Sequence, residues 1–66
     1  MQAPSKIRIE RAHRGLTQDA LARACEVTQA QISRIETGRR TPSPATATRI
    51  AETLGLPPES LFEGER

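Results

Sequence analysis

The segment from Thr17 to Gly38, with the sequence TQDALARACEVTQAQISRIETG, constrains the fold more than any other part of this 66-residue chain. Its first half has a helical period around the small residue Ala22, and the triplet at 26–28 interrupts that period. A second helical period follows, with Ile32 and Ile35 on one side. The segment therefore predicts two short helices joined by a tight turn.

The chain contains residues suited to begin a helix and glycines suited to end one: Ser5, Gly15, Thr17, Thr28, Gly38, Ser43 and Gly55. The expected helices are 6–14, 18–25, 29–37, 44–54 and 58–62. No alternating pattern of a strand is present, so we expect an all-α fold, a compact five-helix domain over residues 1–66. We expect flexible tails at residues 1–4 and 63–66, the second of them acidic.

The apolar positions predict a thin core, because a chain of this length buries only about 60% of its unfolded surface. The expected core residues are Ile7, Leu16, Leu21, Ala22, Val27, Ile32, Ile35, Ala47, Ile50, Ala51, Leu54, Leu56, Leu61 and Phe62. Ile7 and Ile9 lie on nearly opposite sides of the first helix, so one of them should be exposed. We expect Cys25 to be a small buried apolar residue.

The second helix of the central segment carries polar side chains away from its apolar side. At about 100° per residue, Ala30, Arg34 and Thr37 point about 140–200° away from Ile32. Gln and Arg form bidentate hydrogen bonds with adenine and guanine, respectively. Two short helices with such an outer face are typical of a DNA-binding helix-turn-helix. For this helix alone, an ordinary solvated polar face is the alternative.

Glu36 is the exception on this helix, because the same period turns it partly inward. An inward carboxylate needs a partner of opposite charge. Arg11 lies four residues after Ile7, on the same side of the first helix. We therefore expect a structural ion pair between Arg11 and Glu36.

The net charge is only +2, but the charges are unevenly distributed. Residues 28–49 contain four arginines and one acidic residue, whereas residues 50–66 contain four glutamates and one arginine. A surface that faces phosphates has such a concentration of positive charge, and helix N-termini also attract phosphate. The expected phosphate contacts are Gln18, Thr28, Thr37, Arg39 and Arg40. The amide of Gln18 either binds a phosphate oxygen or braces Gln29.

Other functional classes lack the residues that they need. One histidine, one cysteine and scattered carboxylates give no metal-ligand spacing and no nucleophile–base set, so we expect no enzyme, no metal and no cofactor. No apolar run reaches the length of a membrane span, and nothing resembles a signal peptide, which predicts a cytoplasmic, nucleoid-associated protein with no membrane partner. No ligand-sensing domain is evident, so we expect no small-molecule ligand.

Together these residues resemble the phage lambda repressor and Cro type of helix-turn-helix domain, also called the xenobiotic-response-element family. The resemblance covers residues 6–62 and rests on Arg11, Gly15-Leu16-Thr17-Gln18, Leu21-Ala22, Val27-Thr28, Ile32-Ser33, Ile35-Glu36-Thr37-Gly38, Pro42-Ser43, Ala51, Leu54-Gly55 and Leu61-Phe62. It implies five helices, phosphate contacts near Gln18 and after the third helix, and the Arg11–Glu36 pair. The resemblance also implies base contacts from Gln29, Ala30, Gln31, Ser33 and Arg34.

Two residues depart from the family pattern. Glu26 stands in the turn where the family usually has glycine, and a non-glycine residue in a left-handed conformation costs about 1 kcal/mol. Glu10 stands where the family often has an apolar residue, which bears on how the first helix packs.

We therefore expect a transcriptional regulator, a repressor, that binds palindromic double-stranded operator DNA as a homodimer. The expected dimer contact is Leu56, Leu61 and Phe62, which also close the core. One alternative is an antitoxin or a restriction–modification controller built on the same domain. The alternative from another class is a protein-interaction module that has kept the fold and lost DNA binding.

Overall fold

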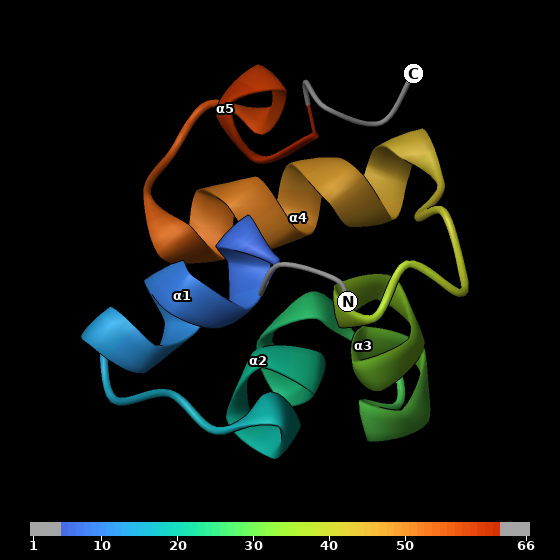
Figure 1. Ribbon diagram of the computed structural model, residues 1–66, viewed down its shortest axis with the longest axis horizontal. Coiled ribbons are helices and arrows are strands. Elements are labelled where there is room, and N and C mark those ends of the chain that lie inside the picture. Colours follow the sequence, from blue (N-terminus) through green and yellow to red (C-terminus); the bar gives the residue numbers. More distant parts are fainter. Residues whose placement is uncertain (1–4, 63–66) are drawn as a thin grey trace.

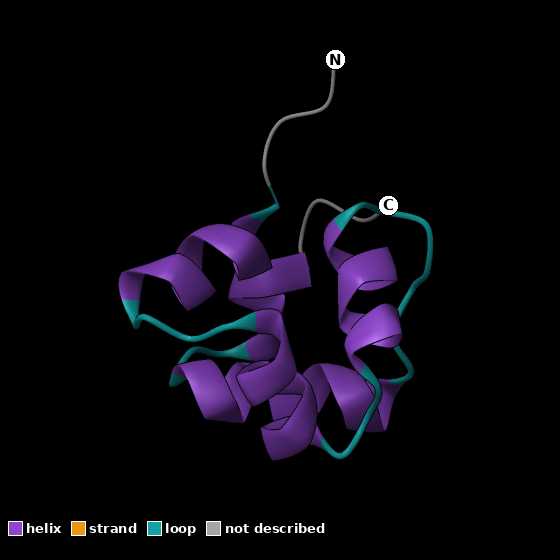
Figure 2. Cartoon of the chain, turned by 90° about the horizontal axis from the view of Figure 1, so that it is seen from below, coloured by secondary structure: helices purple, strands orange, loops and turns teal. Residues whose placement is uncertain are grey.

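The structure, a computed structural model, describes residues 5–62, and all regular structure in that range is helical (Figure 1, Figure 2). The helices are α1 (Lys6–His13), α2 (Gln18–Cys25), α3 (Gln29–Glu36), α4 (Pro44–Leu54) and α5 (Pro58–Phe62). The expected all-α, five-helix fold is confirmed. The tails predicted at residues 1–4 and 63–66 lie outside the described residues.

Capping hydrogen bonds explain where the longer helices begin. The hydroxyl of Thr17 accepts a hydrogen bond from the backbone N–H of Ala20 at 3.0 Å, which satisfies a donor that the helix itself leaves free. The other caps of this kind are Ser5 on α1, Thr28 on α3 and Ser43 on α4. Helices α1 and α3 end one residue earlier than expected, because Arg14 and Thr37 serve as C-caps.

Helix α2 is the centre of the packing, since it contacts both α3 and α4. Helix α5 packs on α4, and α1 packs on α3. Figure 1 shows α4 above α2 and α3, with α3 at the edge of the molecule. The largest fully buried side chains come from α2, α3 and α4: Leu21, Cys25, Ile32, Ile50 and Leu54.

The core agrees with expectation at most positions. The buried apolar residues are Ile7, Leu21, Ala22, Cys25, Ile32, Ile35, Ile50, Ala51, Leu54 and Leu61, and the partly buried ones packed on them are Leu16, Val27, Leu56 and Phe62. Ile7 is buried whereas Ile9 is 42% exposed, as the helical period requires. Ala47 is only half-buried, because it lies one turn before Ile50 at the start of the buried stripe of α4. Within residues 5–62, no helix combines the length and the apolar character that crossing a membrane requires.

Candidate nucleic-acid interface

The turn between α2 and α3 sets the direction of α3. Glu26 has φ 61° and ψ 39°, the left-handed conformation expected for the residue that replaces the usual glycine. Arg49 of α4 donates from Nη1 to the Glu26 carboxylate at 2.9 Å and to the carbonyl oxygen of Cys25 at 3.4 Å. The turn is therefore tied to α4 as well as to the two helices that it joins. Nothing in the sequence pattern indicated this contact, which spans 23 residues.

The inner face of α3 is held by apolar packing and one ion pair. Ile32, Ile35 and Glu36 are its buried residues. Arg11 donates from Nε to Glu36 Oε2 at 2.8 Å and from Nη2 to Oε1 at 3.4 Å. Its Nη1 donates to the carbonyl oxygen of Leu16 at 2.8 Å. The predicted pair of Arg11 and Glu36 is present and joins α1 to α3.

Gln18 connects this ion pair to the start of α3. Its Nε2 donates to Glu36 Oε1 at 3.0 Å, and its Oε1 accepts from Gln29 Nε2 at 3.5 Å. The brace between Gln18 and Gln29 was one of the two expected roles of the Gln18 amide. The contact of Gln18 with Glu36 was not foreseen, because it depends on how the N-terminus of α2 meets the C-terminal end of α3.

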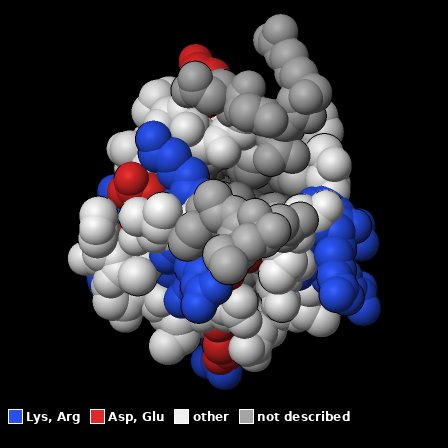
Figure 3. All heavy atoms as spheres, viewed as in Figure 1, with Lys and Arg blue, Asp and Glu red and all other residues white. Residues whose placement is uncertain are grey.

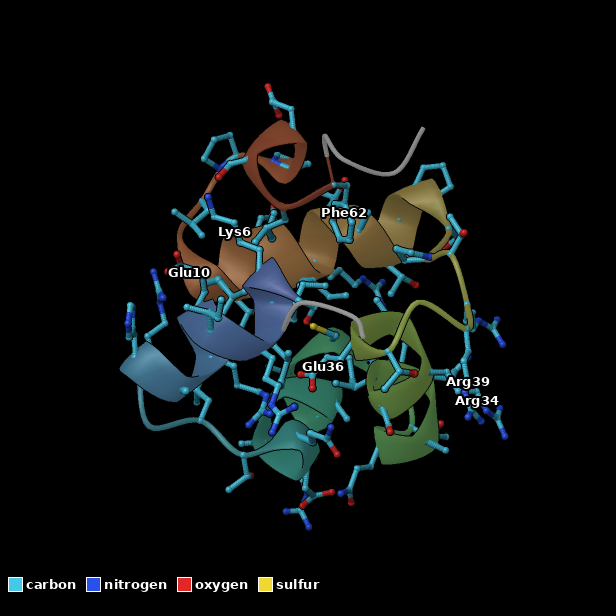
Figure 4. The ribbon with its side chains drawn as sticks, viewed as in Figure 1. Lys6, Glu10, Arg34, Glu36, Arg39 and Phe62 are labelled. Atoms are coloured by element: carbon cyan, nitrogen blue, oxygen red, sulfur yellow. The ribbon has the colours of Figure 1, made fainter. Side chains whose placement is uncertain are left out.

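The outer face of α3 consists of side chains directed into solvent. Gln29, Ala30 and Arg34 are exposed, and Figure 4 shows Arg34 pointing away from the molecule while Glu36 points inward. Gln31 and Ser33 are half-buried. The structure thus exposes three of the five predicted base-contacting residues fully and two in part, and base contact by each of them stays a prediction.

Two of the predicted residues also stabilise the start of α3. The backbone N–H of Thr28 donates to Gln31 Oε1 at 3.0 Å, and the backbone N–H of Gln31 donates to the Thr28 hydroxyl at 3.1 Å. This reciprocal pair is a capping box. The Oε1 of Gln31 is therefore engaged within the helix, which leaves its NH₂ group as the donor that can face a ligand.

The chain after α3 folds back on the end of that helix. The backbone N–H groups of Arg39 and Arg40 both donate to the carbonyl oxygen of Arg34, at 2.8 and 3.2 Å. The hydroxyl of Thr37 donates to the carbonyl oxygen of Ser33 at 3.0 Å. The side chains of Arg34, Arg39 and Arg40 are exposed, and we call these three residues the basic edge.

The basic edge gives this side of the molecule its charge. Figure 3 shows basic side chains gathered at the border of the molecule where Figure 4, in the same view, places Arg34 and Arg39. Guanidinium groups bind phosphate oxygens through a planar fork of N–H donors. The basic edge can therefore bind the phosphates of a polyanion, while the outer face of α3 can contact uncharged polar groups that lie between those phosphates.

Two titratable groups elsewhere have altered acidity. Arg14 donates to the Glu10 carboxylate at 2.8 Å, and this hydrogen bond lowers the pKa of Glu10. The departure at Glu10 is thus accommodated by an ion pair within α1, at a spacing of four residues that the sequence displays. Burial raises the pKa of the Cys25 thiol, which keeps it neutral in the core, as expected.

Comparison with known proteins finds similarity over nearly the whole described range. The model of the HTH_3 family, described as helix-turn-helix, matches residues 7–61. The chain is 46% identical over 58 residues to the HTH-type transcriptional repressor RghR of Bacillus subtilis (strain 168). That match covers 86% of this chain and 43% of the repressor, so the chain spans less than half the length of this curated relative.

Two solved structures have a similar fold. The restriction-modification controller protein C.AhdI from Aeromonas hydrophila matches with a TM-score of 0.79 and 28% identity over 85% of each chain. An HTH_3 family transcriptional regulator from Vibrio cholerae matches with a TM-score of 0.73 and 32% identity, covering 89% of this chain and 33% of that one.

Proposed function

This chain belongs to the HTH_3 helix-turn-helix family of DNA-binding regulators, and we propose that it is a repressor that binds operator DNA with α3 in the major groove. The observation that carries the proposal is the division of α3 into two faces. Ile32, Ile35 and Glu36 attach the helix to the fold, while Ala30 and Arg34 are exposed on the opposite side and Gln29 is exposed at the N-terminal end of the helix. An α-helix fits the major groove of B-DNA when one face is free in this way.

The chemistry of the outer face suits base contacts. A glutamine amide pairs with N6 and N7 of adenine, and a guanidinium pairs with O6 and N7 of guanine. We assign these roles to Gln29 and Arg34. Ala30 is small enough to allow close approach and to contact a thymine methyl group. Gln31 and Ser33, which are half-buried, are expected to contact bases from the sides of the helix.

The phosphate contacts in this proposal flank α3 at both ends. Arg39 and Arg40 follow its C-terminal end, and Thr28 is at its N-terminal end. Gln18 lies at the N-terminus of α2, and Thr37 at the C-cap of α3. Contacts of this kind fix the position of the protein on the duplex and make binding dependent on salt.

The proposal includes a homodimer, because one domain of this size contacts few bases and two-fold dimers read two half-sites about 10–10.5 base pairs apart. The predicted dimer contact consists of Leu56, Leu61 and Phe62. Leu61 is only 8% exposed, so the exposed parts of Leu56 and Phe62 would supply most of this contact. Binding to a chromosomal operator would place the protein in the cytoplasm. The proposed function includes no catalytic step.

A restriction–modification controller is the second candidate function. The match to C.AhdI favours it, because the two folds agree with a TM-score of 0.79 at 28% identity. Both candidates require operator binding by α3. They differ in the genes that lie beside the operator.

Selection of bound duplexes from a randomised DNA pool at about 0.15 M salt tests the proposal. An enriched palindrome with half-sites about 10–10.5 base pairs apart supports a dimeric operator-binding protein. Enrichment of a single short half-site would support DNA recognition by α3 and contradict the homodimer. Salt-sensitive binding with no enriched sequence would contradict the proposal and favour a protein-interaction module.

A further inference from the structure

A small pocket lies between the N-terminal end of α1, the loop that follows α3, and α5, and its volume is about 80 Å³. Ile7, Ile35 and Leu61, which belong to the buried core, form an apolar surface within it. Lys6 from α1 and the half-buried Phe62 from α5 meet at this pocket (Figure 4). The pocket therefore offers a ligand an apolar surface that is continuous with the core.

Two cationic side chains, Lys6 and Arg40, line the same pocket. Both residues are exposed, and neither takes part in the ion pairs formed within residues 5–62. Glu10, which lies one turn after Lys6 on α1, accepts a hydrogen bond from Arg14 at 2.8 Å instead. Positive charge beside an apolar surface favours an anion that has an apolar part.

We propose that this pocket binds a small aliphatic carboxylate, with its charged group between Lys6 and Arg40 and its tail on the apolar surface. Ammonium and guanidinium groups both pair with carboxylates, and a guanidinium can do so through two parallel N–H donors. A water molecule takes up about 30 Å³, so a pocket of about 80 Å³ holds about three groups of that size. Butyrate has a tail of this length and serves as the probe.

Arg40 connects the pocket to DNA binding, because it belongs to the basic edge as well as to the pocket. A carboxylate that pairs with Arg40 neutralises one cation and competes with the DNA phosphate assigned to that residue. The ligand should therefore weaken DNA binding, and DNA should weaken ligand binding by the same factor. This link rests on the proposed function, whereas ligand binding itself does not.

The sequence predicted no small-molecule ligand, because no separate ligand-sensing domain is evident. The pocket joins residues from positions 5–7, 35–42 and 61–62, which lie far apart in the chain. No pattern within a single helix indicates a site of this kind.

NMR titration of the purified full chain with sodium butyrate, at constant ionic strength, tests ligand binding. We expect saturable shift changes at the methyl groups of Ile7, Ile35 and Leu61, with a dissociation constant of about 1–10 mM for so small a ligand. Acetate lacks the tail and butanol lacks the charge, so each should bind about tenfold more weakly. Equal binding of all three compounds, or no saturation with butyrate, would overturn the proposal.

The charged end of the site is tested by removing one cation. Lys6→Gln changes an exposed position and should weaken butyrate binding about tenfold. Arg8→Gln is the matched control, because Arg8 is exposed on the same helix and does not line the pocket. It should bind butyrate as the wild type does. Equal affinities of the wild type and Lys6→Gln would overturn the proposed carboxylate site.

Fluorescence anisotropy with the duplex recovered by selection, in butyrate or in chloride at the same ionic strength, tests the link to DNA. We expect saturating butyrate to weaken wild-type binding about fivefold. Arg40→Gln should no longer respond to butyrate, whereas its matched control Arg39→Gln should still respond, and an equal response of both would overturn the link through Arg40. If the wild type selects no sequence, the proposed function fails, and saturable butyrate binding that is weakened in Lys6→Gln would still support the pocket.

Two other occupants of the pocket would give different results. Glu63 and Glu65 follow Phe62 in the chain, and tighter butyrate binding by a Glu63→Gln, Glu65→Gln double variant would assign the pocket to their carboxylates. Ile7 and Ile35 lie outside the predicted dimer contact, so shift changes at both on dilution without butyrate would assign the pocket to a second copy of the chain. Either result would overturn a free carboxylate as the occupant, and we expect unchanged affinity and unchanged shifts.

Discussion

The two faces of α3 differ in what holds their polar side chains. On the inner face, the Glu36 carboxylate receives hydrogen bonds from Arg11 and Gln18 and is almost fully buried. On the outer face, Ala30 and Arg34 lie in solvent. This difference indicates that stability and recognition are assigned to opposite sides of one short helix. A substitution on the inner face should change folding first, and one on the outer face should change binding alone.

The largest expected effect is on the inner face. Arg11→Ala leaves the Glu36 carboxylate buried without its cation, and the free energy of unfolding should fall by about 3–5 kcal/mol. Urea titration followed by circular dichroism measures this loss. Arg14→Ala is the matched control: it breaks the ion pair with Glu10 within α1 and should leave the free energy of unfolding close to that of the wild type. Equal, near-zero losses in both variants would show that the inner face is not held by the ion pair.

On the outer face, Arg34→Ala should leave the unfolding free energy within about 0.5 kcal/mol of the wild type. Its effect should be on DNA, as a loss of about 1–3 kcal/mol for the best site and a relaxed preference at one base pair. Fluorescence anisotropy with the best site and single-base variants measures both quantities. Arg8→Ala, at an exposed position of α1, serves as the control and should bind as the wild type does. A destabilised Arg34→Ala protein would break the separation of the two faces.

Within the basic edge, we expect Arg39 to contact phosphate and Arg34 to contact a base. Arg39→Ala should weaken binding to all sequences by a similar factor and reduce the slope of log K against log salt by about 1. Affinity measured at several salt concentrations, on the best site and on unrelated DNA, tests this expectation. If Arg39→Ala relaxes a base preference as Arg34→Ala does, the assignment of Arg39 to phosphate is wrong.

The smallest expected effect is at the turn before α3. Glu26→Gly relieves a left-handed conformation that costs about 1 kcal/mol, and loses an exposed ion pair with Arg49 worth less than that. The melting temperature should therefore rise by a few degrees, roughly as expected for a domain of this size. Glu26→Ala loses the ion pair without relieving the backbone, and should melt below the wild type. A lower melting temperature for Glu26→Gly would mean that the contact of Arg49 outweighs the strain.

Local signals predicted most of the fold. Thr17, Thr28 and Ser43 each cap a helix by accepting a hydrogen bond from the backbone N–H three residues later. Because the two partners are so close in the chain, these caps can be predicted from the sequence. Helical periodicity also predicted that Glu36 points partly inward and that one of Ile7 and Ile9 is exposed, because it depends only on the geometry of a single helix.

The contacts that were missed join residues far apart in the chain. Arg49 with Glu26 and Gln18 with Glu36 depend on how helices lie against one another. No spacing within one helix indicates such contacts. The candidate site was therefore predicted as a set of outward residues, with the brace between Gln18 and Gln29 as one alternative and without the hydrogen bond from Gln18 to Glu36.

The most direct test of the two-face account is an NMR titration of the protein with the duplex recovered by selection. Backbone and side-chain amide shifts should change most at Gln29, Ala30 and Arg34 and along residues 39–40, with small changes at Ile32 and Ile35. Largest changes on α1 or α5, with the outer face of α3 unaffected, would contradict the assignment of recognition to that face.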